Sequence, residues 1–553
     1  MPVMNNKQKN YFLSKCLIKA YGELGVKYAF VSPGSRNTPL MLALSDQTKI
    51  KVYNIIDERS SGYMALGAAK INNRPSLLIT TSGTAVSNLF PSIVEGYMSS
   101  VSMIILTADR PKHLVGTGAN QTINQHNIFN NYVNNFIDFY DIHDFNQKTI
   151  FNIAVDTYKQ SIDKNRGPIH INIPFDLPLH INDREKIKIQ ENKLLELDLN
   201  KDSNNQCKIP DFKKYLRPII VCTNNKDLNI VSTAKKYNIP VFMECLGSRF
   251  SKKYDNIISS YEFILTNFNI DADLILRFGN KPISNALNKF IDKRKNITYL
   301  ITEKVFNDDA KNIIKSNPSI FLEEFSKSKF KYNISWLNSL LIKQNKIKKY
   351  IDTFFSKPKE HEGYIINKII SILPSNSNLM IGNSSPIRDL DKFTFNNSSK
   401  TNVFANRGAS GIDGIISTSM GLSLNQKKYN FLILGDISFF YDVSALTNHI
   451  QIPINLNIII LNNNGGHIFD RLEGLSKEKE YSKYWLTPLD LNIKDIAETF
   501  HCKYLKLNYK TLESQNSSIF LDKGIKLIEI QINSDRHQLE NKAIERQIKK
   551  ELV

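Results

Sequence analysis

Short apolar runs that end in a turn and lead into a helical pattern repeat along most of this sequence. Near the N-terminus the runs cover residues 28–31, 52–56, 77–80 and 103–106, with helical patterns at 61–70 and 85–98 and a closing strand at 167–174. Alternating strands and helices are typical of a parallel sheet with helices on both faces. Ligands of such sheets bind beyond the carboxyl ends of the strands.

The same pattern recurs twice further along the chain. Strands are expected at 218–221, 240–243, 274–278 and 298–301, and again at 379–381, 403–405, 431–434, 456–461 and 527–532, with a basic helical stretch at 329–360 between the two groups. A chain of 553 residues also exceeds what one hydrophobic core usually organises. The sequence therefore predicts three doubly wound α/β domains, at 1–185, 211–340 and 341–553, with a polar linker at 186–210.

Composition narrows the class of protein. No apolar run approaches the roughly 18 residues of a membrane helix, and the N-terminus lacks the apolar core of a signal peptide. Five cysteines without a C-x-x-C pair argue against a disulfide scaffold or a zinc ribbon, so we expect a cytoplasmic protein. The net charge of +19 comes from scattered basic residues, which favours a solvated basic surface over nucleic-acid binding and leaves small anionic substrates open.

The most informative pair of motifs is Gly435-Asp436 after one predicted strand and Asn462 to Gly466 after the next. A carboxylate, a side-chain amide and a backbone carbonyl are hard oxygen ligands that suit Mg²⁺. A magnesium ion held in this way commonly bridges the protein to a diphosphate. The alternative is two ordinary turns, because Gly-Asp and Asn-Gly are common turn dipeptides.

Glu58 stands where another predicted strand meets a helix. Taken alone, it is a helix N-terminal residue favoured by the helix dipole.

Further motifs give the sequence a specific resemblance. They lie in order at 31–40, 57–59, 81–85, 106–111, 118–121, 406–413 and 462–469. Together they resemble the family of 2-succinyl-5-enolpyruvyl-6-hydroxy-3-cyclohexene-1-carboxylate (SEPHCHC) synthases, thiamine-diphosphate enzymes of menaquinone and phylloquinone synthesis. The resemblance covers both outer domains and the length, while the central domain matches only in outline. The departures are Ile437, where the cofactor signature has glycine, the position of Lys281, and His467 and Asp470 in the loop after the amides.

The resemblance implies a transferase and carboligase. It would decarboxylate 2-oxoglutarate with thiamine diphosphate and add the succinyl carbanion to isochorismate by conjugate addition. Glu58 is then the catalytic carboxyl group that exchanges a proton with N1′ of the aminopyrimidine, and Mg²⁺, or Mn²⁺, is held by Asp436, Asn463 and the carbonyl of Gly465. By the same resemblance the first domain binds the pyrimidine and the third the diphosphate and metal. The implied cofactor-binding residues are Glu58, Thr81, Ser82, Gly83, Gly408, Ile412, Asp436, Ile437, Ser438, Asn463 and Gly465.

Both implied substrates are dicarboxylates, which guanidinium groups bind well. The resemblance assigns this role to Arg36, Arg110, Arg388 and Arg407, with Ser35, Asn120, Gln121 and Ser384 as hydrogen-bonding partners and Ile468, Phe469 and Leu472 as cavity walls. A surface ion pair remains an equal alternative for Arg388. Core packing remains the alternative for the three wall residues and for Ile412, the implied apolar support of the cofactor.

Family members bind the cofactor between two subunits, which implies a homodimer or homotetramer with Glu58 and Asp436 from different chains. One alternative function keeps the cofactor and changes the 2-oxoacid, as in an acetohydroxyacid-synthase-like or decarboxylase enzyme. The arginine-rich loops and Ile437 argue against it. A catalytically idle anion-binding or scaffolding protein is a third hypothesis, opposed by the joint presence of Glu58, Asp436 and Asn463.

Overall fold

The computed structural model describes residues 4–142, 146–163, 165–190, 207–247, 249–250, 254–304, 308–327, 333–395, 400–424, 428–472 and 474–552. The chain forms two compact units. The N-terminal unit comprises residues 1–201, 406–425 and 442–454, and the C-terminal unit comprises 202–405, 426–441 and 455–553. Among the described residues, no helix has both the length and the apolarity to cross a membrane.

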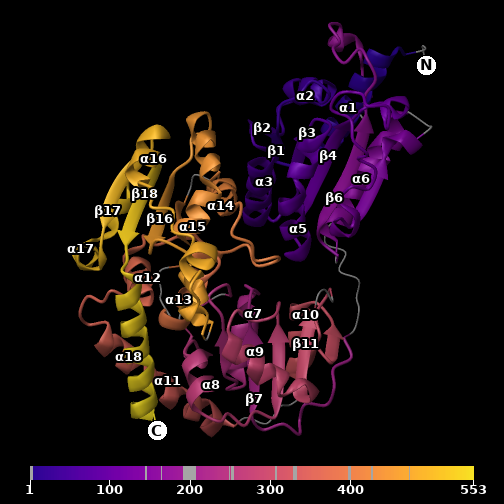
Figure 1. Ribbon diagram of the computed structural model, residues 1–553. Coiled ribbons are helices and arrows are strands. Elements are labelled where there is room, and N and C mark those ends of the chain that lie inside the picture. The colour runs from indigo at the N-terminus through magenta and orange to yellow at the C-terminus, as the bar shows by residue number, and fades with distance from the viewer. Residues whose placement is uncertain are drawn as a thin grey trace. The chain divides into compact units, whose positions relative to one another are not determined.

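A parallel sheet of six strands organises the N-terminal unit, and Figure 1 shows β1, β3, β4 and β6 side by side. The order is β2 (Lys51–Asn54), β1 (Tyr28–Val31), β3 (Ser76–Thr80), β4 (Met103–Asp109), β6 (Pro168–Pro174) and β5 (Asn135–Asp138). Its helices are α1 (Asn6–Glu23), α2 (Thr38–Ser45), α3 (Glu58–Asn72), α4 (Thr84–Asn88), α5 (Phe90–Met98) and α6 (Gln147–Ile162). Every residue of β3 and β4 is buried, as expected of strands covered on both faces.

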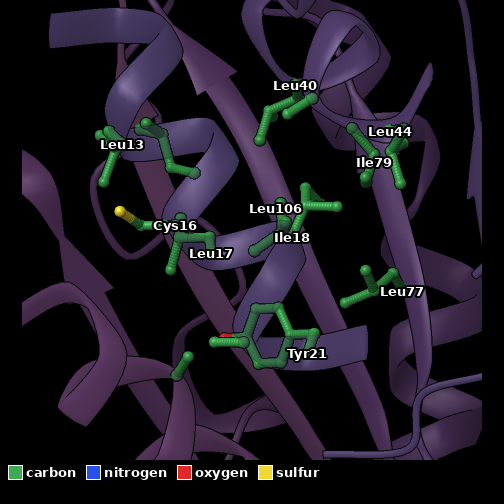
Figure 2. Close-up of a cluster of buried hydrophobic side chains, with 14 of the residues drawn as sticks. Leu13, Cys16, Leu17, Ile18, Tyr21, Leu40, Leu44, Leu77, Ile79 and Leu106 are labelled. Atoms are coloured by element: carbon green, nitrogen blue, oxygen red, sulfur yellow. The ribbon is translucent and has the colours of Figure 1, made fainter. Parts of the chain in front are cut away.

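The core on one face of this sheet is built by α1. Figure 2 shows Leu17, Ile18 and Tyr21 of that helix beside Leu77 and Leu106 of the strands. These side chains are at most 1% exposed. Burial of each large apolar side chain contributes about 1.5–3 kcal/mol, so this cluster fixes the sheet whose ends carry the candidate site.

A later segment of the chain completes the N-terminal unit. Helix α14 (Ile415–Ser423) packs against α3 at two glycines. A Cβ atom at Gly67 would lie 2.1 Å from the carbonyl oxygen of Thr418, and one at Gly421 would lie 2.1 Å from that of Met64. The close approach of the two backbones therefore requires glycine at both positions.

The C-terminal unit holds two further six-stranded parallel sheets. The central sheet has the order β12 (Asn312–Lys315), β11 (Thr298–Thr302), β10 (Leu274–Phe278), β7 (Pro218–Cys222), β8 (Val241–Met243) and β9 (Ile257–Ile258). The last sheet has the order β14 (Asn402–Phe404), β13 (Ser377–Ile381), β15 (Tyr429–Gly435), β16 (Leu456–Asn462), β18 (Ile525–Gln531) and β17 (Lys503–Leu507).

Helices join and cover these two sheets. With the central sheet come α7 (Leu228–Lys236), α8 (Tyr261–Asn267), α9 (Asn285–Asp292), α10 (Pro318–Lys327) and α11 (Ile334–Phe354). With the last sheet come α12 (Glu362–Ile372), α13 (Ser385–Phe393), α15 (Asp436–Tyr441), α16 (Ile493–Thr499), α17 (Tyr509–Glu513) and α18 (Ser534–Leu552).

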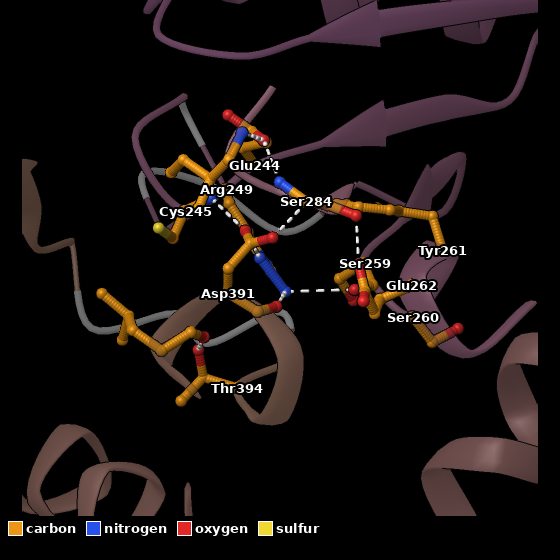
Figure 3. A network of polar contacts seen from close by, with 12 residues as sticks. Glu244, Cys245, Arg249, Ser259, Ser260, Tyr261, Glu262, Ser284, Asp391 and Thr394 are labelled. Carbon is orange, nitrogen blue, oxygen red and sulfur yellow. Dashed lines mark hydrogen bonds and ion pairs between the residues drawn. The ribbon is translucent and has the colours of Figure 1, made fainter. Parts of the chain in front are cut away.

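A buried polar network connects the central sheet to α13 (Figure 3). Arg249 donates to Oδ1 of Asp391 at 2.9 Å and to the carbonyl of Ser259 at 3.2 Å, and Tyr261 donates to the other carboxylate oxygen of Asp391. The backbone N–H of Cys245 donates to the same Oδ1 at 2.8 Å. Because a buried charge that loses its partner is strongly destabilising, this network holds α13 in one position.

The predicted fold class is confirmed, with three parallel α/β sheets. The predicted strands are present, but β5, β9, β12 and β17 were not predicted, and all four lie at sheet edges. The single helix expected at 85–98 is wrong, because α4 ends at Asn88 and α5 begins at Phe90, with Pro91 in its first turn. The predicted linker at 186–210 falls mostly on residues 191–206, outside the described residues.

Candidate active site

Three neighbouring strands bring the first group of predicted site residues together. Strands β1, β3 and β4 are adjacent and parallel, so the loops after them meet at one edge of the sheet. Those loops carry Arg36, the segment 81–83 and Arg110.

Arg36 and Arg110 form the basic part of this edge. Arg36 is 3% exposed, and its Nη1 donates to the carbonyl of Phe175 at 2.7 Å. Burial, and then the positive charge of Arg110, lowers the pKa of Arg36. In the part of the chain that the structure describes, the buried Nε atoms of both arginines lack a hydrogen-bond partner. Two close guanidinium groups with unused donors are suited to an anion, most of all to a carboxylate.

The loop after β3 is held by two glutamines. Ser82 donates from its hydroxyl to the carbonyl of Gln121 at 3.0 Å, and the Gln121 side chain donates back to the Ser82 carbonyl at 3.0 Å. The backbone N–H of Gly83 donates to Gln125 at 2.9 Å, and Gln125 in turn donates to the carbonyl of Ala108 at 3.2 Å. Gln125, which the sequence analysis missed, therefore ties this loop to β4.

The other predicted residues at this edge differ in burial. Thr81 is buried, and its hydroxyl has no partner among the described residues. Ser35 and Asn120 are exposed.

Glu58 is the first residue of α3 and is half-buried. The Asp57 carboxylate caps the helix by accepting from the backbone N–H groups of Arg59 and Ser60. The amide of Asn88 donates to Oε2 of Glu58 at 3.3 Å. The helix start therefore presents the carboxyl group at the carboxyl end of β2.

The segment that carries Arg407, Gly408 and Ile412 belongs to the N-terminal unit. Glu95 of α5 accepts from the backbone N–H groups of Gly408 at 2.9 Å and Ala409 at 2.7 Å. A Cβ at Gly408 would lie 2.8 Å from the carbonyl of Glu95, so only glycine allows this approach. Arg407 and Ile412 are half-buried.

Asp436 follows β15 directly and is 4% exposed. Its Oδ1 accepts from the backbone N–H of Ile437 at 2.9 Å, and its Oδ2 accepts from that of Gly465 at 2.8 Å. Burial raises the pKa of Asp436 to about 6. Strand β16 pairs with β15, with Leu461 opposite Gly435, so Asn463 leaves the sheet beside Asp436.

The residues after β15 and β16 fit a divalent cation. The Asn463 side-chain nitrogen donates to Oε1 of Glu362 at 2.9 Å, while its Oδ1 is buried and has no partner in the described chain. Gly465 has φ 142°, a conformation that favours glycine. An unused amide oxygen, a buried carboxylate and a glycine carbonyl are the expected donor types for Mg²⁺. Ser438 is buried and Ile437 half-buried in the first turns of α15.

Arg388 lines a pocket of about 320 Å³ in the C-terminal unit, together with Ser284, Asn285, Lys392 and Arg471. Its Nη1 donates to the carbonyl of Ser384, which has φ 72°, at 2.6 Å. Arg471, another residue that the sequence analysis missed, lies 3.5 Å from Asp389.

Two of the three apolar residues predicted to wall the cavity are exposed. Phe469 is 37% and Leu472 55% exposed, and Ile468 is half-buried. Core packing is therefore excluded for the first two.

Two departures from the family pattern have local partners. Lys281 is half-exposed and forms an ion pair with Asp309 at 2.6 Å. His467 lies 2.8 Å from Asp470 within the same short helical turn.

The predicted site residues are divided between the two compact units. The N-terminal unit holds Ser35, Arg36, Glu58, Thr81, Ser82, Gly83, Arg110, Asn120, Gln121, Arg407, Gly408 and Ile412. The C-terminal unit holds Ser384, Arg388, Asp436, Ile437, Ser438, Asn463, Gly465, Ile468, Phe469 and Leu472.

Comparisons with known proteins find two thiamine pyrophosphate domains in this chain. Residues 13–128 match the family described as thiamine pyrophosphate enzyme, N-terminal TPP binding domain, and residues 389–530 match its C-terminal TPP binding domain. Among curated relatives, a 2-succinyl-5-enolpyruvyl-6-hydroxy-3-cyclohexene-1-carboxylate synthase of Leuconostoc mesenteroides is 32% identical over 91% of this chain and 93% of the relative. One of Bacillus pumilus is 32% identical over 97% of this chain and 96% of the relative. The chain therefore belongs to the 2-succinyl-5-enolpyruvyl-6-hydroxy-3-cyclohexene-1-carboxylate synthase family of thiamine pyrophosphate enzymes.

Proposed function

We propose that this protein is a SEPHCHC synthase that joins 2-oxoglutarate to isochorismate with loss of CO₂, in menaquinone or phylloquinone synthesis. The observation that carries the proposal is the close pair Arg36 and Arg110 at the sheet edge that also holds the loop 81–83. Both arginines have a buried Nε without a partner among the described residues, which suits dicarboxylate substrates.

Thiamine diphosphate, when bound, supplies the electron sink for cleavage and formation of the carbon–carbon bonds. Glu58 holds the proton that is exchanged with N1′ of the aminopyrimidine. Thr81, Ser82, Gly83, Gly408, Ile412, Ile437 and Ser438 would contact the bound cofactor. Asp436, the side-chain oxygen of Asn463 and the carbonyl of Gly465 hold Mg²⁺, or Mn²⁺ in its place. The unused Oδ1 of Asn463 supports this metal assignment.

Substrate binding rests on the arginines of both units. Arg36, Arg110, Arg388 and Arg407 bind the carboxylates, and Ser35, Asn120, Gln121 and Ser384 donate hydrogen bonds to them. Ile468, Phe469 and Leu472 exclude water from the reacting atoms. The exposure of Phe469 and Leu472 leaves their side chains available to contact a bound substrate.

We also propose that the enzyme is a cytoplasmic homodimer or homotetramer whose sites lie between subunits, with Glu58 and Asp436 from different chains. Its domains are residues 1–185, 211–340 and 341–553, joined by the linker at 186–210. Light scattering coupled to an activity assay tests the assembly, since a monomer with full turnover contradicts it.

The function is tested by the loss of isochorismate absorbance with purified protein, 2-oxoglutarate, thiamine diphosphate and Mg²⁺, each omitted in turn. Loss that requires all four components is the expected result. If isochorismate persists although thiamine diphosphate binds, the substrate assignment fails. The enzyme then acts on another 2-oxoacid, as an acetohydroxyacid-synthase-like or decarboxylase enzyme, and a screen of 2-oxoacids identifies it.

A further inference from the structure

Glu362 makes a contact with the proposed metal site that the reaction itself does not explain. It is the first residue of α12 and is 3% exposed. Its Oε1 accepts from the side-chain nitrogen of Asn463 at 2.9 Å, across 101 positions of sequence. Ionisable side chains are rarely buried to this degree without a specific partner. Asn463 is such a partner of Glu362, which suggests that the contact has a role at the site.

The hydrogen bond decides which end of the Asn463 amide faces the site. A side-chain amide has a donor end and an acceptor end, and exchanging the two reverses the hydrogen bonds that it makes. Burial, and then the charge of Asp389, raises the pKa of Glu362 to about 8, and the two carboxyl groups share a hydrogen bond. The carboxyl proton is therefore used toward Asp389, which leaves Oε1 of Glu362 as an acceptor that selects the Asn463 nitrogen and turns Oδ1 away. That Oδ1 is buried and without a partner in the described part of the chain.

The loop that carries Asn463 is fixed from two further sides. The backbone N–H of Gly465 donates to Oδ2 of Asp436 at 2.8 Å, which places the loop against the other proposed metal ligand. The Ser534 hydroxyl lies 3.4 Å from the carbonyl of Asn463. The backbone is therefore held independently of Glu362, and what Glu362 adds is the orientation of the side chain.

The position of Glu362 is itself well determined. Its backbone N–H donates to Nδ1 of His537 at 3.2 Å, and the preceding residue, His361, caps α12 by accepting from the N–H of Tyr364 at 3.3 Å. The acceptor is therefore in place before any ligand binds.

We propose that Glu362 is a positioning residue for the metal, because it orients the Asn463 amide so that Oδ1 is preset as a ligand of the divalent cation. The inference rests on the proposed function only in taking Asp436 and Asn463 as metal ligands, and does not depend on the substrates. Groups that orient metal ligands typically contribute 10–100-fold to metal affinity, so an effect of about that size is expected.

The test is a titration of the full-length protein with Mn²⁺ in saturating thiamine diphosphate, with free Mn²⁺ followed by electron paramagnetic resonance. Glu362→Gln keeps an acceptor oxygen at the same reach, so its Kd for Mn²⁺ is expected within about threefold of the wild type. Glu362→Leu removes the acceptor and is expected to raise the Kd by about 10–100-fold. Glu362→Asp withdraws the acceptor by one methylene and is expected to bind Mn²⁺ about tenfold more weakly. Because it keeps a carboxyl group, it provides the test if the Leu variant does not fold.

Glu360→Gln is the matched control. Glu360 accepts from the backbone N–H of Asn533 at 3.0 Å, and the structure gives its carboxylate no hydrogen bond to Asn463, so its variant is expected to bind Mn²⁺ as the wild type does. Wild-type affinity in both the Leu and Asp variants overturns the inference, as does a Gln variant that binds as weakly as Leu. A wild type that binds Mn²⁺ but leaves isochorismate unchanged contradicts the proposed reaction alone. A wild type that binds no Mn²⁺ contradicts the metal assignment and the inference with it.

Discussion

The carboxylate of Asp436 accepts a hydrogen bond from the backbone N–H of Gly465 at 2.8 Å, which joins the ends of two neighbouring strands. The two residues are 29 positions apart, and parallel pairing of β15 with β16 brings them together. Asp436 is buried, and Oδ1 of Asn463 at the end of the neighbouring strand is buried without a partner in the described chain. An anionic site of this kind is prepared for a cation before the cation binds.

Asp436→Asn should therefore weaken retention of thiamine diphosphate in Mg²⁺. The variant keeps the size of the side chain and removes its charge, and a direct ligand should contribute at least the roughly 100-fold that an orienting group can. Calorimetric titration with thiamine diphosphate, with and without EDTA, measures the effect. Asp522→Asn, which changes an exposed carboxylate, is the control and should bind normally. Tight retention by the wild type in EDTA would contradict the metal assignment.

Glu58→Gln should bind thiamine diphosphate within a few-fold of the wild type and lose most turnover. The amide cannot exchange a proton with the aminopyrimidine, and general acid–base groups typically contribute about 10²–10⁴-fold. Initial rates of isochorismate loss, paired with calorimetric cofactor binding, separate the two effects. Asn88→Ala removes only the 3.3 Å hydrogen bond to Glu58 and should cost less than about tenfold. Unchanged turnover in Glu58→Gln would remove Glu58 as the partner of N1′.

The interior strands could be predicted from the sequence because strands buried on both faces are nearly continuous apolar runs. The segments Met103–Asp109 and Leu456–Asn462 are of this type. The edge strands Asn135–Asp138 and Lys503–Leu507 are only partly buried and carry polar residues, so their hydrophobic signal is weak. They form because a neighbouring strand offers its hydrogen-bonding edge, which is a tertiary effect.

Some residues of the candidate site could likewise be predicted from local sequence, and others could not. Asp436 and Asn463 are recognisable because glycines and strand ends surround them in sequence. Glu362 is not, because its partner is 101 residues away and a glutamate at the start of a helix is locally unremarkable. Gln125 is also missed, since its contacts to Gly83 and Ala108 come from the packing of a loop against two strands.

Arg110→Lys should raise the KM of one dicarboxylate substrate and leave cofactor binding unchanged. Lysine keeps the charge but lacks the planar fork. A hydrogen bond to a charged group contributes about 1.5–3 kcal/mol, so the expected increase in KM is about 10- to 150-fold. Separate KM values for 2-oxoglutarate and isochorismate identify the substrate. Arg184→Lys is the control, because Arg184 forms an ion pair with Asp46 and neither residue is among the predicted site residues. Normal KM values for both substrates would exclude Arg110 from the site.

Gly67→Ala should destabilise the protein through the contact between α3 and α14. The added methyl group would lie 2.1 Å from the carbonyl oxygen of Thr418, which is backbone and cannot easily shift. Overpacking of this kind costs about 1–3 kcal/mol. The midpoint of urea unfolding should fall accordingly. Gly22→Ala is the control, because a Cβ at this helix position has its nearest neighbour at 3.4 Å, and alanine should stabilise α1 by about 0.5–1 kcal/mol. Equal midpoints for the two variants would contradict the close packing.

His170 should make the stability of the protein depend on pH. The side chain is fully buried, lies between Phe129 and Phe136, and makes a 2.8 Å hydrogen bond with Thr107. Burial, and then the charge of His126, lowers the pKa of His170 to about 3. Between that value and the unfolded value of about 6.5, the unfolded chain binds a proton that the folded chain does not.

The contribution of His170 to the free energy of unfolding should therefore be largest above pH 6.5 and fall as the pH decreases, by up to about 1.4 kcal/mol per pH unit. Burial raises the pKa values of Asp436, Asp442 and Glu362, and these three groups contribute in the opposite direction.

His170→Phe keeps an aromatic ring beside Phe129 and Phe136 and removes the titrating group. In urea unfolding from pH 4.5 to 7, the change of the free energy of unfolding with rising pH should therefore be less positive than in the wild type. Thr107 retains its 2.9 Å hydrogen bond to Asn172 in that variant, which limits the loss of stability at neutral pH. His113→Phe changes an exposed histidine and should keep the wild-type slope. If His170→Phe keeps that slope as well, His170 is not the group that destabilises the fold in acid.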